Sequence, residues 1–442
     1  MTDSKYFIQC KECNHKINNF KSWFEVKQAC PECGSHQADV VYYRDMADLK
    51  KLIRDKSFQP NSLWGYFDFL PLEDRKNIVS IGSEGIKPID RWTFLEDFAK
   101  RKYNIHIKVY AHRHDFNHAT GTFKDLAGTV VASVLKENKI KNFVGASTGN
   151  IGVAYSRYLA HAGINLYLFL PEISVKSQEA EIAAFGQNVF RTNGDYAYAK
   201  KMAKDFAEKH NFLLTAGNFC PMRLEAKKTM VYEWLRLLPE FPTVFMQAIS
   251  GGSGPIGVVK ACKELEKQGM FEKMPRLILP QPNACAPMAE AWTKAKAENF
   301  PKGWERDYPV YENPQTSIQT LSTGNPTAYP AMATMVRESN GEIISSDEEK
   351  AADIARLISY KTSWRIGPAA AITMVGFFQA LREKTIKDGD VVMLNIGEGT
   401  GREPDFKEKT AFPMRNLTNI DEIELTDIDK HEEELWKAVE NV

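Results

Sequence analysis

Residues 118–130 read HATGTFKDLAGTV, and this stretch decides the fold that the sequence predicts. Gly121 and two threonines come just before Lys124, and the small and apolar residues after it recur at helical spacing. We therefore expect Lys124 at the start of a helix, behind a close approach of small residues. A lysine at that place is either a solvated residue of the first helical turn or a buried amine with a chemical role.

Short apolar runs alternate with helical periods on both sides of this stretch. Each run is bounded by Gly or Asn and followed by a helical pattern, which is the βαβ signature of a parallel sheet. The strand-like runs are IHIKVYAHR (105–113), FVGAS (143–147), LYLFLPE (166–172), TVFMQAIS (243–250) and VVMLNIG (391–397). We predict an α/β protein with two open sheets, parallel or mixed, and helices on both faces.

The order of these segments predicts the domains. A small domain is expected at residues 138–240, and a large domain is expected to combine residues 46–137 with residues 241–442. Residues 1–45 form a separate module. Residues 283–345 are rich in Pro, Asn and Thr and show little periodicity, so we expect mainly loops there.

Four of the seven cysteines stand in two CxxC pairs within the N-terminal module. Two such pairs separated by a short arm let four thiolates converge on one tetrahedral ion, and the CPECG turn is typical of a zinc knuckle. The predicted ligands of a structural Zn²⁺ are Cys10, Cys13, Cys30 and Cys33. The alternatives are a ribbon that folds without metal and a pair of dithiols. Four sulfur ligands would leave no open position for catalysis.

The charge balance excludes several classes of partner. The chain of 442 residues has 57 basic (Lys and Arg) and 57 acidic side chains, so no overall field favours nucleic acid or an anionic membrane. The N-terminal residues lack the pattern of a secretory signal, and no apolar run is long enough to cross a bilayer. We expect a cytoplasmic protein that binds any anion locally.

A glycine-rich segment, SGGSGPIG at 250–257, follows a predicted strand and opens a helix. Small residues there expose backbone N–H groups at a helix N-terminus, which suits a phosphate group. The segment lacks the GKS or GKT ending of a nucleoside triphosphate loop, and no acidic residue for a ribose follows the next strand. A monophosphate therefore fits better than a dinucleotide, and a turn without a ligand is the alternative. The candidate ligands are Ser250, Gly251, Gly252, Ser253 and Gly254.

A second strand-to-helix turn comprises Ser147, Thr148, Gly149 and Asn150. Hydroxyl and N–H groups at a helix start suit a carboxylate, and the Asn150 amide can bond a ring hydroxyl or phenolate. Plain N-capping is the alternative for this turn. Together with Lys124, the two turns supply what a pyridoxal phosphate enzyme needs: an amine for a Schiff base, a phosphate anchor and a clamp for an amino acid. Burial lowers the pKa of a lysine, which helps it act as nucleophile and proton carrier.

The residues after about position 80 resemble the fold-type-II pyridoxal phosphate enzymes, which have the tryptophan synthase β-like fold. Within that family the sequence is most similar to the threonine synthase and cysteate synthase group. The segments that carry the resemblance are SEGIKPI (83–89), ATGTFKD (119–125), ASTGN (146–150), NFCPMRLEAKKT (218–229) and QAISGGSGPIG (247–257). A four-cysteine ribbon at the N-terminus also occurs in this group.

The resemblance implies roles for individual residues. Lys124 would hold the cofactor and move the α-proton of the substrate, and Asn150 would meet the ring oxygen of the cofactor. Ser147 to Asn150 would bind the substrate carboxylate, and Gly251 to Gly254 the cofactor phosphate. Asn395 is the first choice to face the pyridine nitrogen. Thr400 is the second choice for the pyridine nitrogen, and the candidates on the substrate side are Thr122, His118 and Arg113.

Three departures separate the chain from an ordinary threonine synthase. His118-Ala119 replaces Asn-Pro, Leu126 replaces Arg, and IGEG at 396–399 replaces a TGHG-like turn. The resemblance then favours a β-replacement on O-phospho-L-serine with sulfite, giving L-cysteate and phosphate. The alternatives are threonine synthase acting on O-phosphohomoserine and water, a dinucleotide-dependent enzyme, and a non-catalytic zinc-ribbon interaction protein. Relatives imply a homodimer.

Overall fold

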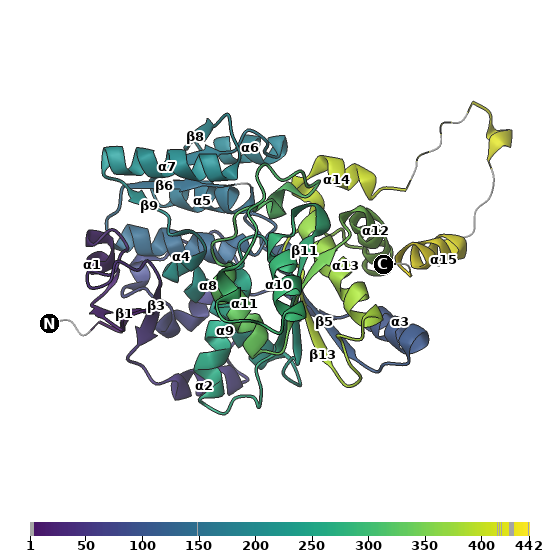
Figure 1. The fold of residues 1–442 in the computed structure, drawn as a ribbon, viewed down its shortest axis with the longest axis horizontal. Coiled ribbons are helices and arrows are strands. Elements are labelled where there is room, and N and C mark those ends of the chain that lie inside the picture. The colour runs from purple at the N-terminus through teal and green to yellow at the C-terminus, as the bar shows by residue number, and fades with distance from the viewer. Residues whose placement is uncertain are drawn as a thin grey trace.

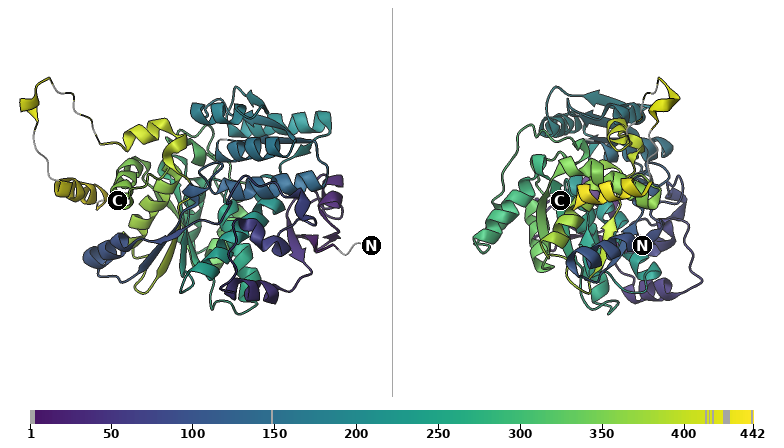
Figure 2. Two further views of the ribbon diagram at one scale, coloured as in Figure 1. Left: turned by 180° about the vertical axis from the view of Figure 1, so that it is seen from behind. Right: turned by 90° about the vertical axis from the view of Figure 1, so that its right-hand side faces the viewer.

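The computed structural model describes residues 4–147, 149–412, 414, 416, 418–423, 428–440 and 442. Thr148, one of the predicted site residues, lies outside the described residues. The described chain forms three sheets, and the N-terminal module and the C-terminal helix lie at opposite ends of the molecule (Figures 1 and 2). Within the described residues, no helix is long and apolar enough to span a membrane.

The N-terminal module is a small antiparallel sheet with the strand order β2-β1-β3. Its strands are β1 (Tyr6–Cys10), β2 (Lys16–Ile17) and β3 (Ala38–Tyr42). The buried aromatic side chains Tyr6, Phe20 and Trp23 join the main hydrophobic core of the protein. The module is therefore packed against the rest of the chain and is not a tethered appendage.

The larger sheet has the strand order β12-β11-β10-β13-β5-β4, and all its pairs are parallel except β4 with β5. Alternate residues of its central strand face two different hydrophobic clusters, with Met393 in one and Val392 and Leu394 in the other. Helices thus cover both faces, as predicted. The strands are β4 (Ile89–Arg91), β5 (Lys108–His112), β10 (Val244–Met246), β11 (Arg276–Pro282), β12 (Glu342–Ser346) and β13 (Val391–Asn395).

The smaller sheet is entirely parallel and has the strand order β8-β7-β6-β9. Helices α5 (Asn150–His161) and α7 (Tyr196–His210) pack on either side of it (Figure 1). All its strands fall within residues 138–240, where the sequence predicts a small domain, and the exact boundaries stay a prediction. The strands are β6 (Asn142–Ala146), β7 (Asn165–Leu170), β8 (Asn188–Arg191) and β9 (Leu213–Leu214).

Three packed helices position residues of the candidate active site. Helix α4 (Lys124–Glu137) is buried on every side from Asp125 to Leu135, because its residues are almost all small or apolar. It packs against α8 (Pro221–Leu237), which in turn packs against α9 (Ser253–Glu266). Lys124 and Ser253 are the first residues of α4 and α9, and Arg223 lies in the first turn of α8.

The other helices complete the layers over the sheets. Residues 283–345 contain two of them, so the expectation of mainly loops in that range is only partly right. Alanine-rich sequence after Pro287 and after Pro330 favours helix there despite the weak periodicity. These helices are α1 (Phe20–Glu25), α2 (Met46–Arg54), α3 (Thr93–Tyr103), α6 (Lys176–Ala183), α10 (Pro287–Ala297), α11 (Tyr329–Glu338), α12 (Ala351–Thr362), α13 (Pro368–Arg382), α14 (Pro404–Lys409) and α15 (Ile428–Val439).

Substituting Gly128 by alanine tests how closely α4 must approach α5. A Cβ atom at residue 128 would lie 2.5 Å from Cδ2 of Tyr158, so the two helices would have to separate. We expect the free energy of unfolding of Gly128→Ala to fall by about 1–3 kcal/mol, the usual cost of overpacking, as measured by urea denaturation.

The second variant, Tyr158→Leu in the Gly128→Ala background, removes the ring that the new methyl group meets. It should recover part of the loss, so that the two changes are coupled in a double-mutant cycle. A Gly128→Ala protein that gains about 1 kcal/mol, as alanine does at an unhindered helix position, would contradict the packing argument.

Candidate active site

A cavity of about 390 Å³ lies where strands of the two parallel arrays end. Its walls include the residues at or directly after the carboxyl ends of β6, β9, β10 and β13, namely Ser147, Thr215, Gln247 and Asn395. Ligands of α/β proteins usually bind at this edge, because loops and helix N-termini converge there. The start of α4, with Lys124, forms another part of the wall.

Lys124 is half-buried and faces this cavity. Its Nζ lies 4.0 Å from the centre of the Phe123 ring. Burial, together with the positive charge of Arg223, lowers the pKa of Lys124 to about 7, although Glu398 acts in the opposite direction. A large fraction of the amine is therefore neutral and nucleophilic near neutral pH. The Lys124 backbone N–H donates to Oγ1 of Thr122 at 3.1 Å, which holds the start of the helix.

The glycine-rich loop lines the cavity, and all five predicted ligands belong to the wall. Gly252 caps α9 with a φ of +84°, a conformation that favours glycine. A Cβ atom at Gly251, Gly252 or Gly254 would meet a neighbouring side chain at 2.0 to 2.5 Å. The backbone can approach a ligand here only because these residues have no side chain, so the N-terminus of α9 offers its N–H groups to an anion.

The turn after β6 has a second arrangement of small residues. Oγ of Ser147 accepts hydrogen bonds from the backbone N–H groups of Gly149 and Gly152, each at 3.0 Å. The Ser147 hydroxyl thus caps the start of α5, as the capping alternative expects. Ser147, Gly149 and Asn150 all line the cavity.

Two buried amides have oxygen atoms that remain available to a ligand. Nδ2 of Asn150 donates to Oε2 of Glu398 at 2.5 Å, and Nδ2 of Asn395 donates to Oε1 of Gln247 at 2.7 Å. Within the described residues, neither Oδ1 atom has a hydrogen-bond partner. Oε1 of Glu398 accepts from the backbone N–H of Ala369 at 2.6 Å, so this carboxylate joins the late turn to α5 and α13.

Arg113 lies in the protein interior, away from the cavity wall. Its guanidinium pairs with Asp90 at 3.0 Å and with Asp115 at 2.6 Å, and it lies 4.1 Å from the centre of the Phe116 ring. These contacts occupy the side chain in a structural ion-pair cluster. The structure therefore does not bring Arg113 to the other predicted site residues.

The remaining predicted residues do not belong to the described cavity wall. Thr122 holds the backbone of Lys124 and forms a β-bridge with Glu398. His118 is exposed, and Thr400 is buried in the short helix that follows the late turn. Their proposed contacts with substrate or cofactor stay predictions.

Sequence reasoning missed several residues that the fold brings to the cavity. Glu398 lies in the IGEG turn, where the sequence signalled only that the turn is unusual. Gln247 is the first residue after β10. Ligand sites usually lie at the carboxyl ends of strands, so this position could have identified Gln247 as a candidate from the sequence. Arg223 lines the cavity, and Lys227, one helical turn further along α8, lies outside the described wall; both donate to Oγ of Ser253, at 3.5 and 2.5 Å.

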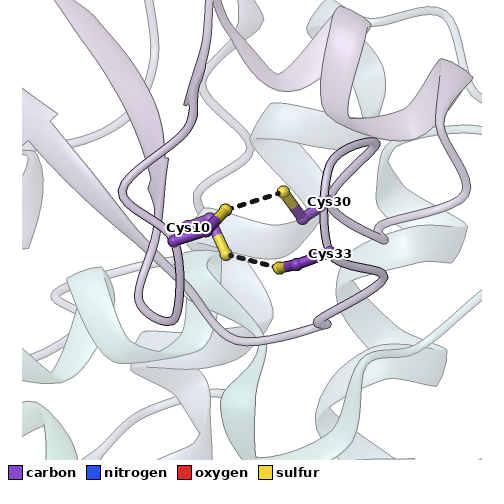
Figure 3. Close-up of side chains that lie close together, drawn as sticks. Cys10, Cys30 and Cys33 are labelled. Carbon is purple, nitrogen blue, oxygen red and sulfur yellow. Dashed lines mark hydrogen bonds between the residues drawn. The ribbon is translucent and has the colours of Figure 1, made fainter.

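The four cysteines of the N-terminal module converge, as Figure 3 shows for the labelled Cys10, Cys30 and Cys33. The sulfur atoms all lie within 4.8 Å of one another. Sγ of Cys10 is 3.5 Å from Sγ of Cys33, and Sγ of Cys13 is 3.5 Å from Sγ of Cys30. The spacing predicted this cluster, and its donor set of four sulfurs could bind zinc.

These features describe an α/β protein with a half-buried lysine and a glycine-rich helix N-terminus at one cavity. Residues 86–397, more than half of the chain, match the model of the family described as pyridoxal-phosphate dependent enzyme. The chain belongs to this family. The fold-type-II family predicted from the sequence is confirmed, and so is the prediction of an enzyme.

Two curated relatives extend over nearly the whole chain. Threonine synthase of Methanocaldococcus jannaschii is 27% identical over 387 residues, covering 86% of this chain and 90% of the relative. Cysteate synthase of Methanococcoides burtonii is 25% identical over 418 residues, covering 94% of this chain and 93% of the relative. The chain is thus similar to enzymes of both kinds.

Solved structures show the same fold at lower sequence identity. Threonine deaminase isoform 2 of Solanum lycopersicum superposes with a TM-score of 0.59 at 15% identity, covering 83% of this chain and 88% of that chain. Maize serine racemase gives a TM-score of 0.58 at 16% identity, covering 73% of this chain and 92% of that chain.

The residues around the cavity fit pyridoxal phosphate. The neutral amine of Lys124 suits an aldehyde, and the glycine-lined N-terminus of α9 suits a phosphate group. The unpartnered amide oxygens of Asn150 and Asn395 can accept hydrogen bonds from polar positions on a ring.

The lowered pKa of Lys124 predicts how its reactivity depends on pH. Only a neutral amine is nucleophilic, so acylation of Lys124 by a small amine-reactive ester should rise with pH, reach half its maximum at about pH 7, and then level off. Exposed lysines should continue to gain reactivity up to their ordinary pKa of about 10.4. Peptide mass spectrometry after brief labelling measures both. A Lys124 profile that follows the exposed lysines would contradict the argument.

Proposed function

We propose that the protein catalyses a pyridoxal phosphate-dependent β-replacement on O-phospho-L-serine, with sulfite as the nucleophile and L-cysteate and phosphate as products. The observation that carries this choice is the charge of the cavity. Among the described residues of its wall, the basic side chains are Lys124, Lys200, Lys204 and Arg223, whereas the single carboxylate is Glu398. Such a cavity suits two anions, a leaving phosphate and a charged nucleophile, better than a phosphate and neutral water.

Lys124 would carry the covalent and proton-transfer steps. Bound pyridoxal phosphate supplies an aldehyde and an electron-accepting ring, which stabilises negative charge at the α-carbon of an amino acid. The neutral Nζ of Lys124 would be the amine that holds the cofactor through its aldehyde, with loss of water, and Nζ would accept the α-proton of the substrate. Its low pKa favours both tasks, because the amine is neutral without being strongly basic.

The other residues would bind and orient. Gly251 to Gly254 would hold the cofactor phosphate, Asn150 would bond the ring oxygen, and Asn395 would bond the pyridine nitrogen. The turn from Ser147 to Asn150 binds the substrate carboxylate. Arg223 lies on the same wall as the loop and provides positive charge for a departing phosphate.

Threonine synthase is the second candidate, because relatives of both kinds cover most of the chain. In that reaction O-phosphohomoserine and water give threonine and phosphate. The same lysine, loop and turn would serve it, so the choice of substrate depends on the wall on the substrate side.

Phosphate release by the purified protein distinguishes the two reactions. We expect phosphate from O-phosphoserine only when sulfite is present, accompanied by a product with the mass of cysteate. The matched reactions use O-phosphohomoserine with and without sulfite. Release from O-phosphohomoserine alone, with a threonine mass, would replace the proposal by threonine synthase. A Lys124→Ala protein should be inactive in both reactions and should bind no cofactor covalently.

We also propose that the four cysteines hold one structural Zn²⁺ and that the protein is a homodimer. The sulfur cluster supports the metal, since four thiolates at this spacing suit tetrahedral zinc. Sedimentation or light scattering of the purified protein measures the mass of the assembly, and a monomeric mass would contradict the dimer.

The zinc proposal predicts one metal ion per chain by elemental analysis. Cys13→Ser should lose the metal and lower the melting temperature, because the module is packed into the main core. The control is Cys285→Ala, at a buried cysteine outside the module, which should retain zinc whatever its stability. A wild-type protein free of metal but fully folded would contradict the proposal.

A further inference from the structure

Lys227 is a buried lysine directly behind the glycine-rich loop. It lies on α8, and its Nζ donates to Oγ of Ser253, the first residue of α9, at 2.5 Å. The same Nζ lies 5.2 Å from the centre of the Phe123 ring, beside the residue that carries the reactive amine. Lys227 does not belong to the described wall of the cavity, so it reaches the cavity through Ser253.

The neighbouring lysine shows how unusual this environment is. Lys228 is equally buried, but it pairs with Glu225 at 2.7 Å and with Glu264 at 2.8 Å. Lys227 forms no ion pair within the part of the chain that the structure describes, and its recorded partner is the hydroxyl of Ser253. A buried cation without a counter-charge is costly, so the surroundings of Lys227 are electrostatically incomplete until an anion is present.

Other basic groups gather at the same loop. Nη2 of Arg223 also donates to Oγ of Ser253, at 3.5 Å. Burial lowers the pKa of Lys227 well below its usual value, and the charges of Lys124 and Arg223 lower it further, while Cys220 acts weakly in the opposite direction. An anion on the loop would relieve this repulsion and favour the protonated form of Lys227.

The hydrogen bonds determine where the hydroxyl proton of Ser253 points. A serine hydroxyl can accept two hydrogen bonds and donate one. When Lys227 and Arg223 both donate to Oγ, its acceptor capacity is used, and the proton is left for a third partner. An anion at the N-terminus of α9 would fit as that partner, because backbone N–H groups and the helix dipole there also favour negative charge.

We propose that Lys227, together with Arg223, orients and polarises Ser253 so that the loop selects a doubly charged phosphate monoester. Lys227 is thus a positioning residue, and its hydrogen bond to Ser253 acts on the phosphate end of the ligand. The proposal rests on the proposed function in one respect, since it takes the cofactor phosphate as the group held by Gly251 to Gly254.

The test compares two ligands that differ only in the phosphate. Dissociation constants of the full-length protein for pyridoxal phosphate and for pyridoxal are measured from the visible absorbance of the bound compound. Lys227→Gln keeps a polar side chain but removes the charge. We expect it to weaken pyridoxal phosphate by about 10- to 100-fold, the range supplied by a hydrogen bond to a charged group. Binding of pyridoxal should be unchanged.

Two further variants test whether the lysine acts through the serine. Ser253→Ala should also weaken pyridoxal phosphate selectively. The double variant Lys227→Gln/Ser253→Ala should bind it no more weakly than the worse single variant, because both changes remove the same interaction. Additive losses would mean that Lys227 does not work through Ser253 and would overturn the proposal.

The control is Lys263→Gln, on the exposed face of α9, where the lysine pairs with Glu338 at 2.8 Å. It removes one positive charge from the same helix and should leave both dissociation constants unchanged. Thermal unfolding of the cofactor-free proteins checks that each variant folds. If Lys227→Gln does not fold, Lys227→Met takes its place in the same measurements.

The remaining outcomes separate this proposal from the proposed function. Equal weakening of pyridoxal phosphate and pyridoxal by Lys227→Gln would show a general structural role and overturn the proposal while leaving the enzyme class intact. Equal affinity of the wild-type protein for both compounds would show that the loop holds no phosphate, which removes the basis of the proposal. A wild-type protein that forms no visible complex with either compound would contradict the proposed function itself.

Discussion

The burial of helix α4 between α5 and α8 is the constraint on which the site depends. Small and apolar residues let the neighbouring helices approach α4 closely, and Gly128 leaves no room for even a methyl group beside Tyr158. Because the helix is enclosed from Asp125 to Leu135, its first residue, Lys124, is held at the cavity wall. The same enclosure removes water from the amine and lowers its pKa to about 7.

A buried charge network joins the N-terminal module to this arrangement. Tyr42 of β3 donates to Glu225 at 2.7 Å, and Lys260 of α9 lies 3.2 Å from the same carboxylate and 3.4 Å from Asp39 of β3. Lys228 also pairs with Glu225. The module therefore contacts both helices whose N-terminal turns line the cavity, α8 with Arg223 and α9 with the glycine-rich loop. Since buried ion pairs tolerate little displacement, the position of the module and the positions of these helices are coupled.

The cavity wall carries both basic side chains and a carboxylate. Its basic side chains suit anionic ligands, while Glu398 is the carboxylate that reaches the wall and orders the Asn150 amide. The glycine-rich loop supplies N–H groups without side chains, so a phosphate can approach the backbone directly. The fold is shared with threonine deaminase and serine racemase, whereas the charge of the cavity wall in this chain is set by a few side chains.

The sequence by itself determined the features that depend on local order along the chain. The βαβ alternation, the helix that starts at Lys124, the turns at 147–150 and 250–257 and the two cysteine pairs could all be predicted, because each is written in a few adjacent residues. Tertiary structure alone decided the pairs between distant residues. Asn150 meets Glu398, which is 248 positions away, and Asn395 meets Gln247, which is 148 positions away. Asp90 and Asp115 pair with Arg113, a predicted substrate-binding residue, and the packing of α8 against α9 brings Lys227 to Ser253. Side-chain partners of this kind depend on how helices and sheets pack. That packing involves residues far apart in the chain, so it cannot be predicted from short stretches of sequence.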